Sequence, residues 1–162
     1  MNSRNATTRL RSLARMAVIG AALLAGTAQV HVQAQVQAQT VPVDALYQQL
    51  GGQSGLVMLM DELMTRLLAD PRMQPFFKDV DQPHVKEQLV AQFCEVSGGP
   101  CRLKDSNMKK VHAGIDITRT DFNALVEVLQ ESMDARGILF ATQNRLLARL
   151  APMHREIVNA PQ

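Results

Sequence analysis

The chain has 162 residues, 46% of them hydrophobic, which suits one globular domain with a sizeable core and excludes a wholly disordered chain. It carries 17 Lys and Arg against 15 Asp and Glu. Four of these basic residues, and no acidic residue, lie in residues 1–38, so the remainder holds 13 basic against 15 acidic residues. A net charge of −2 argues against a basic nucleic-acid-binding surface there, and no nucleic-acid partner is expected.

Residues 1–38 have the order of a secretory signal peptide followed by a flexible tether. A cationic region at residues 4–15 precedes an uncharged, mostly apolar run of eleven residues at 16–26, and small residues follow it. A membrane-spanning helix needs about 20 apolar residues, so this run is too short and no stable membrane span is expected. We expect cleavage after Ala28, Ala34 or Ala38, a globular domain at residues 44–160, and a periplasmic or secreted location.

Apolar residues recur at helical spacing through most of the remaining chain, and no segment alternates strictly enough to predict a strand. Four amphipathic stripes predict helices that include residues 56–67, 85–93, 122–133 and 146–157. A shorter helix is expected at residues 108–113. The fold class is therefore all-α, because each stripe must bury its apolar face against another helix.

Turn-forming residues bound these predicted helices. They are Gly51-Gly52 before the first helix, Asp70-Pro71 after it, Pro83 in the first turn of the second, Gly98-Gly99-Pro100 after it, Thr118 or Thr120 as cap of the third, and Gly137 before the last. Ser54 is a possible N-cap of the first long helix.

Two cysteines, Cys94 and Cys101, allow two interpretations. Export would place them in an oxidising compartment, where a disulfide could persist. They could equally be two small hydrophobic side chains buried separately. Their spacing is not that of a CxxC motif, so a metal site is not indicated.

The usual catalytic signatures are missing, and the four histidines are the main candidates for chemistry. His112 differs from His31, His84 and His154 because it lies one helical turn after Met108, on the same side, and small residues follow it. An isolated histidine is nevertheless more often a surface or packed residue than a ligand.

A series of motifs changes this assessment. LYQQLGGQSGL at 46–56, LADPRMQPFFKDVD at 68–81, GGPC at 98–101 and MKKVHAG at 108–114 occur in this order. Together they resemble the group I truncated haemoglobins, short bacterial globins with a two-over-two helical sandwich around a haem pocket. The resemblance extends over residues 46–158 and implies haem b (iron protoporphyrin) as cofactor.

The resemblance also implies roles for individual residues. His112 matches the proximal histidine that binds the haem iron. Cofactor contacts are implied for Phe77, Val85, Leu89, Met108 and Phe122, and a gas-binding pocket for Met64, Val85, Leu89 and Phe93. From charge alone, His84, Lys86 or Lys110 could meet the haem propionates.

Two departures from the family concern the distal side. Relatives commonly carry Tyr where this chain has Met64, and often Gln where it has Leu89; those polar groups donate hydrogen bonds to bound O2. Here the distal pocket is apolar unless Gln88 or Gln92 turns inward. Without a donor we expect fast O2 dissociation and easy oxidation to the ferric state.

Three functions follow as hypotheses. The leading one is a haem-binding globin, not an enzyme, that binds or transports O2 or another diatomic gas such as NO or CO. The alternative is a haem-dependent NO dioxygenase or peroxidase-like enzyme, which needs a partner reductase because the chain has no flavin or nicotinamide domain. A haem-free helical module or a Met-rich copper carrier is less favoured, because the Met residues lie at core-like spacing.

Overall fold

The computed structural model describes residues 42–104 and 107–160, which belong to the unit Gln39–Gln162. The signal peptide and tether expected at residues 1–38, with His31, lie outside the described residues. Within the described ranges every regular element is helical, which confirms the all-α prediction. None of these helices is long and apolar enough to cross a membrane.

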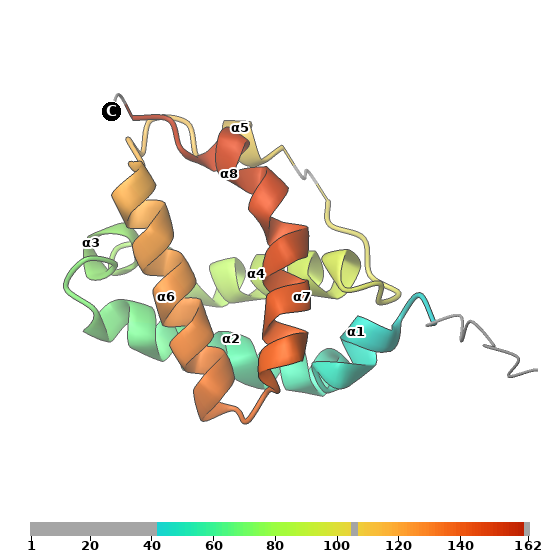
Figure 1. The fold of residues 1–162 in the computed structure, drawn as a ribbon. Helices are drawn as coiled ribbons and strands as arrows, with labels where there is room; N and C mark the ends of the chain where they lie inside the picture. The colour runs from blue at the N-terminus through green and yellow to red at the C-terminus, as the bar shows by residue number, and fades with distance from the viewer. Residues whose placement is uncertain (1–41, 105–106, 161–162) are drawn as a thin grey trace, which may run out of the picture. The chain divides into compact units, whose positions relative to one another are not determined.

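The four long helices form two crossed layers (Figure 1). One layer contains α2 (Gly52–Ala69) and α4 (Gln82–Val96), and the other contains α6 (Arg119–Ala135) and α7 (Phe140–Leu150). Helix α2 packs on α4 and α6, while α7 packs on α4 and α6. The structure thus has the expected two-over-two sandwich.

The core between these layers is aliphatic and rich in methionine. Side chains that are essentially inaccessible to solvent include Leu56, Leu59, Met60, Leu67, Met133 and Leu146. Burying one such side chain stabilises the fold by about 1.5–3 kcal/mol. The predicted stripe of α2 is therefore confirmed as its core face, whereas Val85, Leu89 and Phe122 of the other stripes are only half-buried.

Short helical pieces precede, connect and follow the long helices. They are α1 (Ala45–Gln49), α3 (Gln74–Phe77), α5 (Met108–Val111), the 3₁₀ turn η1 (Ala151–Met153) and α8 (His154–Ile157). The prediction of one helix through residues 146–157 is wrong, because α7 ends at Leu150. Pro152 lacks an N–H donor and its ring clashes with the carbonyl four residues earlier, which breaks the helix. After this break α8 packs against α5.

The predicted boundaries are mostly confirmed at the helix starts. Asp81 caps α4, with Pro83 in its first turn, and Thr118 caps α6 in a capping box with Asp121. The N-cap of α2 is Gly51 rather than Ser54. Gly51 has a φ of 87°, a left-handed conformation that glycine adopts without steric cost.

The boundary after α4 depends on glycine for two reasons. Gly98 has a φ of 88°, and a Cβ atom there would overlap the carbonyl oxygen of Val43. A side chain at this position would therefore be strained and would also collide with the backbone that enters α1. The helix stops here, as the Gly-Gly-Pro sequence predicts.

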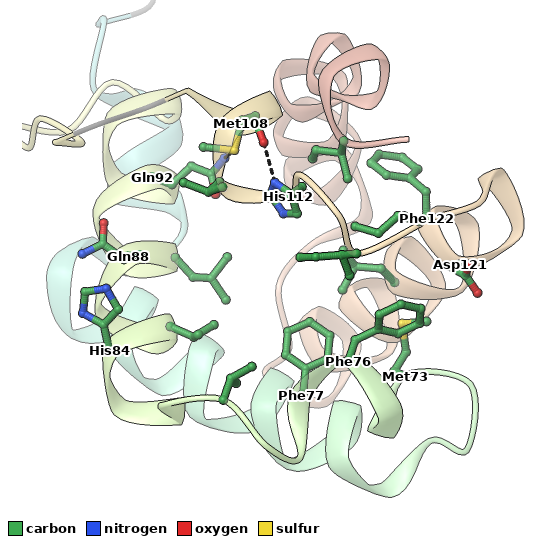
Figure 2. A pocket seen from close by; sticks show the side chains of 18 of the residues that line it. Met73, Phe76, Phe77, His84, Gln88, Gln92, Met108, His112, Asp121 and Phe122 are labelled. Carbon is green, nitrogen blue, oxygen red and sulfur yellow. Dashed lines mark hydrogen bonds between the residues drawn. The ribbon is translucent and has the colours of Figure 1, made fainter. Parts of the chain in front are cut away.

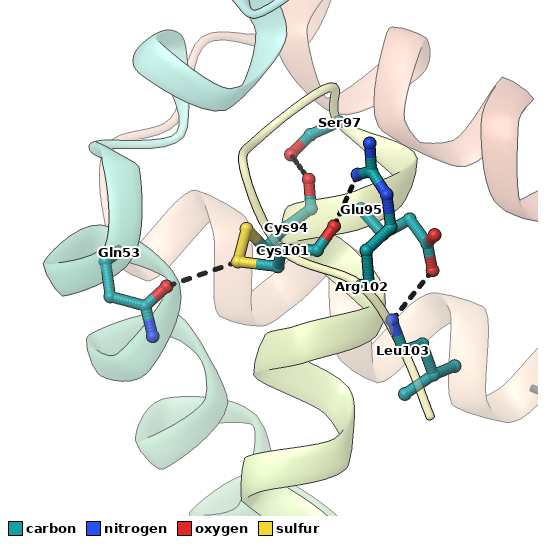
Figure 3. The surroundings of a disulfide bond; sticks show 7 residues. All are labelled: Gln53, Cys94, Glu95, Ser97, Cys101, Arg102 and Leu103. Atoms are coloured by element: carbon teal, nitrogen blue, oxygen red, sulfur yellow. Dashed lines mark hydrogen bonds between the residues drawn. A yellow bond between two sulfur atoms is a disulfide. The ribbon is translucent and has the colours of Figure 1, made fainter. Parts of the chain in front are cut away.

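The open question about the cysteines is answered by a Cys94–Cys101 disulfide (Figure 3). The bridge ties the last turn of α4 to the segment that leaves the Gly-Gly-Pro turn. Two residues after Cys101, the backbone N–H of Leu103 donates to the Glu95 carboxylate at 3.0 Å. The disulfide and this hydrogen bond hold the start of the segment that leads to α5 and His112.

Candidate functional site

An apolar cleft of about 430 Å³ opens between α4 and the segments that carry α3, α5 and the start of α6. Most of the side chains that line it are hydrophobic: Met73, Phe76, Phe77, Val80, Val85, Leu89, Leu103, Met108, Val111, Ile115, Ile117, Phe122, Leu125 and Ile157. The polar ones are His84, Gln88, Gln92, Lys104, His112 and Asp121. Such a cleft suits a large, mainly apolar ligand that a few polar groups orient.

The cleft brings together six of the residues singled out in the sequence: Phe77, Val85, Leu89, Met108, His112 and Phe122. Met64 and Phe93 are buried but are not among the side chains that line it. Phe93 is part of the core between the helical layers. The cleft face of α4 contains Val85, Leu89 and Gln92, which lie four and three residues apart. Phe93 comes directly after Gln92, so its side chain points about 100° further round the helix and away from this face.

His112 is held with one ring nitrogen fixed and the other free. It is the C-cap of α5, and its backbone N–H donates to the Met108 carbonyl oxygen at 3.2 Å. Its Nδ1 lies 2.8 Å from the same oxygen. A carbonyl oxygen can only accept, so in the neutral imidazole Nδ1 carries the proton and Nε2 keeps its lone pair. The half-buried ring projects into the cleft (Figure 2), which is the arrangement of a histidine metal ligand with a fixed tautomer.

The opposite wall, on α4, offers apolar side chains to the interior. Val85 and Leu89 line the cleft there. The amide nitrogen of Gln92 lies 3.0 Å from the sulfur of Met153 and 3.5 Å from that of Met108. Gln88 is exposed, and in Figure 2 its side chain points away from the interior of the cleft. Gln92, in contrast to Gln88, lines the cleft, and its side chain extends from α4 towards Met108.

Two basic side chains at the rim can meet an acidic edge of a ligand. Lys104 and His84 line the cleft. Lys86 instead pairs with Asp61 on α2 at 2.6 Å, and Lys110 is not among the lining residues. The propionate contacts expected from charge alone are thus narrowed to His84, with Lys104 as an additional candidate.

The acidic residue in the cleft wall is already engaged. The Asp121 carboxylate accepts hydrogen bonds from the backbone and side chain of Thr118, at 3.0 and 2.6 Å. It serves the N-terminus of α6 rather than a ligand. The interior therefore presents mainly hydrophobic surface, the amide of Gln92 and one free imidazole nitrogen, with the basic side chain of Lys104 at the rim.

A family model described as bacterial-like globin matches residues 45–159. The group 1 truncated haemoglobin GlbN of Nostoc sp. (strain MUN 8820) is 30% identical over 117 residues, which cover 72% of this chain and 99% of that protein. This chain belongs to the group 1 truncated haemoglobins. Membership of a globin family makes this globin a haem-binding protein.

Solved truncated haemoglobins share the fold of this globin. The Fe(III) form from Tetrahymena pyriformis has a TM-score of 0.67 at 25% identity and covers 70% of this chain and 97% of its own. The 2/2 haemoglobin from Synechococcus sp. PCC 7002, in the cyanomet state with covalently attached haem, has a TM-score of 0.66 at 20% identity, covering 70% of this chain and 98% of its own. At that lower identity the likeness concerns the fold alone.

The residues of this cleft fit a haem group. The porphyrin is a broad apolar plate, and the aromatic and aliphatic walls supply matching surface. Its iron takes a histidine nitrogen as axial ligand, and Nε2 of His112 is free for that role. Its propionates are anionic, and Lys104 and His84 lie at the rim.

Proposed function

We propose that Nε2 of His112 is the axial ligand of the haem iron and that this globin reversibly binds O2 or another diatomic gas on the side of Val85 and Leu89. The observation that carries the proposal is the 2.8 Å hydrogen bond between His112 Nδ1 and the Met108 carbonyl. It fixes the tautomer with a lone pair on the nitrogen that faces the cleft. The haem supplies an iron that coordinates the gas.

The chain's own residues determine what the site favours. Phe77 and Phe122 supply apolar surface to the cleft, which favours a hydrophobic ligand over water there. Val85 and Leu89 offer no hydrogen bond to a polar gas ligand, and Gln92 is occupied with two sulfur atoms. We therefore propose weak stabilisation of O2 relative to CO, with fast O2 dissociation.

The alternative, a haem-dependent redox enzyme, receives less support from these side chains. Peroxide chemistry uses a positioned acid or base close to the reacting atoms. Asp121 is engaged by Thr118, and the His84 side chain points away from the cleft interior in Figure 2. Turnover would also need a reductase as partner. NO consumption by the oxygenated protein with an added electron donor would favour this alternative.

We further propose that residues 1–38 are a signal peptide and tether ahead of a globin domain at 44–160, and that the protein works in the periplasm or outside the cell. The Cys94–Cys101 disulfide supports this proposal, because structural disulfides persist in oxidising compartments. Expression of the full chain followed by N-terminal sequencing of the periplasmic fraction tests it. A mature start within residues 29–39 is expected, and an intact cytoplasmic chain would contradict it.

The axial ligand is tested by absorption spectra of ferric and ferrous protein, wild type beside His112→Ala. The variant should lose the wild-type ferrous spectrum and recover a similar one when imidazole is added, since free imidazole can occupy the space of the lost ring. His154→Ala, which removes a histidine that does not line the cleft, is the matched control and should keep the wild-type spectrum. Unchanged spectra in His112→Ala would overturn the assignment.

A further inference from the structure

The backbone behind His112 is held by a residue that lies 47 positions later in the chain. Asn159 follows α8, and its side-chain Nδ2 donates to the carbonyl oxygen of His112 at 2.7 Å. Its Oδ1 accepts from the backbone N–H of Ile117 at 2.8 Å. One amide side chain therefore connects both ends of the loop between α5 and α6.

Backbone hydrogen bonds continue this connection. The N–H groups of Asn159 and Ala160 both donate to the Ile117 carbonyl oxygen at 3.1 Å. Ile117 and Ile157, on the two joined segments, both line the cleft. The C-terminal segment thus holds the part of the cleft wall that includes His112.

These contacts account for the polar groups of His112 one by one. The backbone N–H and Nδ1 both donate to the Met108 oxygen, at 3.2 and 2.8 Å. The carbonyl oxygen accepts from Asn159, with a longer contact of 3.4 Å from the Ile115 N–H. Nε2 is the one polar atom of the residue that these bonds leave for a ligand.

The backbone conformation of the loop between α5 and α6 explains why the hydrogen bonds to Asn159 can stabilise it. It contains Gly114 with a φ of 77° and Asp116 with a φ of 56°. A positive φ costs free energy for a residue with a Cβ atom, although Asp tolerates it better than most, so surrounding contacts help to maintain this conformation. The backbone N–H of Ile117, one residue after Asp116, donates a hydrogen bond to Asn159, and this bond restrains the backbone next to Asp116.

We propose that Asn159 is a positioning residue for the axial histidine: by bonding the His112 carbonyl and the Ile117 N–H, it sets the orientation of the His112 ring in the cleft. The proposal rests on the proposed function, in which Nε2 binds the haem iron. Asn159 acts only through His112 and Ile117.

Two substitutions separate the two bonds. Asn159→Asp keeps an acceptor for the Ile117 N–H but places a carboxylate oxygen, which cannot donate, against the His112 carbonyl. Asn159→Leu removes both bonds at similar volume. Asn144→Asp is the matched control, because Asn144 is exposed on α7, is not among the cleft residues, and undergoes the same change of charge.

The decisive measurement is the iron–histidine stretching band in the resonance Raman spectrum of the ferrous, gas-free protein. Both Asn159 variants should shift or broaden this band, and Asn144→Asp should not. Transfer of haem to an excess of acceptor apoglobin should be at least about two- to fivefold faster in Asn159→Asp, because the loss of one exposed neutral hydrogen bond accounts for that much and repulsion between the carboxylate and the carbonyl oxygen adds to it. Far-UV circular dichroism of each variant should match that of wild type.

Hydrogen exchange of the haem-free protein gives a readout that does not involve haem. Protection of the Ile117 amide should fall in Asn159→Leu and remain in Asn159→Asp. Wild-type Raman bands in both Asn159 variants, with His112→Ala still losing the band, would overturn this inference and leave the proposed function intact. A band that persists in His112→Ala would instead show that the proposed function is wrong.

Discussion

The disulfide between Cys94 and Cys101 spans the turn at which α4 ends, with the two Cα atoms 5.7 Å apart. Cys94 is fully buried in the core, whereas Cys101 is half-buried beside Gln53 of α2. Leu103, two residues beyond the bridge, lines the cleft. The covalent bond therefore joins the core of the sandwich to the segment that runs along the cleft.

Reducing this disulfide should lower the free energy of unfolding by about 2–3 kcal/mol, the value for closing a loop of this short length in the unfolded chain. Urea unfolding followed by circular dichroism, with and without a phosphine reductant, measures the change. The haem should be kept ferrous and CO-bound in both samples, so that the reductant acts only on the disulfide.

The double variant Cys94→Ala/Cys101→Ala is the control, because it has no disulfide to reduce. Its unfolding curve should be the same with and without reductant. An equal response of wild type and the double variant would mean that the bridge contributes nothing measurable to stability.

Leu89→Gln should slow O2 dissociation about tenfold. Leu89 lines the α4 wall of the cleft, and glutamine adds an N–H donor at similar volume. A hydrogen bond to a group that carries partial negative charge stabilises it by about 1.5 kcal/mol, which corresponds to roughly tenfold in rate. Stopped-flow displacement of O2 by CO measures the rate. Leu89→Met adds no such donor and should remain close to wild type; equal rates in the two variants would contradict an apolar distal side.

The long helices could be predicted from the sequence because each buries a continuous stripe. Periodicity marked the core face of α2 from Leu56 to Leu67, and the glycine and proline residues marked its ends. A stripe cannot reveal α3, which has only four residues. The stripe predicted for the last helix also continues past Pro152. The apolar spacing persists there, although the backbone hydrogen bonding of the helix does not.

Within the candidate site, relationships between residues close in sequence could be predicted, whereas contacts between residues far apart in sequence could not. His112 and Met108 are one turn apart, so their relationship can be read from spacing. Asn159 reaches His112 across 47 residues, and Lys104 reaches the rim through the path of a loop. Neither residue lies in a motif, and only the packing of α8 on α5 brings Asn159 to its partner.

Lys104→Glu should speed haem loss by about two- to fivefold. Lys104 is exposed at the rim of the cleft, and exchanging its charge replaces attraction to a propionate with repulsion. Exposed ion pairs contribute only about 0.2–1 kcal/mol, so a larger effect is not expected. The rate of haem transfer to an acceptor apoglobin measures it, and raising the salt concentration should reduce the difference from wild type.

Lys109→Glu is the matched control for this change of charge, since Lys109 is exposed on α5 but does not line the cleft. Its rate of haem loss should stay near that of wild type. If both variants accelerated haem loss equally, the effect would come from the overall electrostatic potential around α5 and not from a contact between Lys104 and a propionate.

Asp70→Asn should weaken the dependence of stability on acid pH. Asp70 ends α2, and hydrogen bonds from Arg72, including one of 2.7 Å from its guanidinium, lower the pKa of the Asp70 carboxyl below its ordinary value of 3.8. A carboxyl whose pKa is lower in the folded state stabilises the fold above its unfolded pKa, and this contribution disappears as the pH falls through the folded pKa. The difference in urea midpoint between wild type and Asp70→Asn should therefore narrow from pH 7 to pH 3.

Asp79→Asn is the control, because Asp79 is an exposed carboxyl whose contact with Lys78 is 3.8 Å, and it should show no comparable narrowing. A difference for Asp70→Asn that stays constant over this range would show that Arg72 does not act on stability through the Asp70 carboxylate.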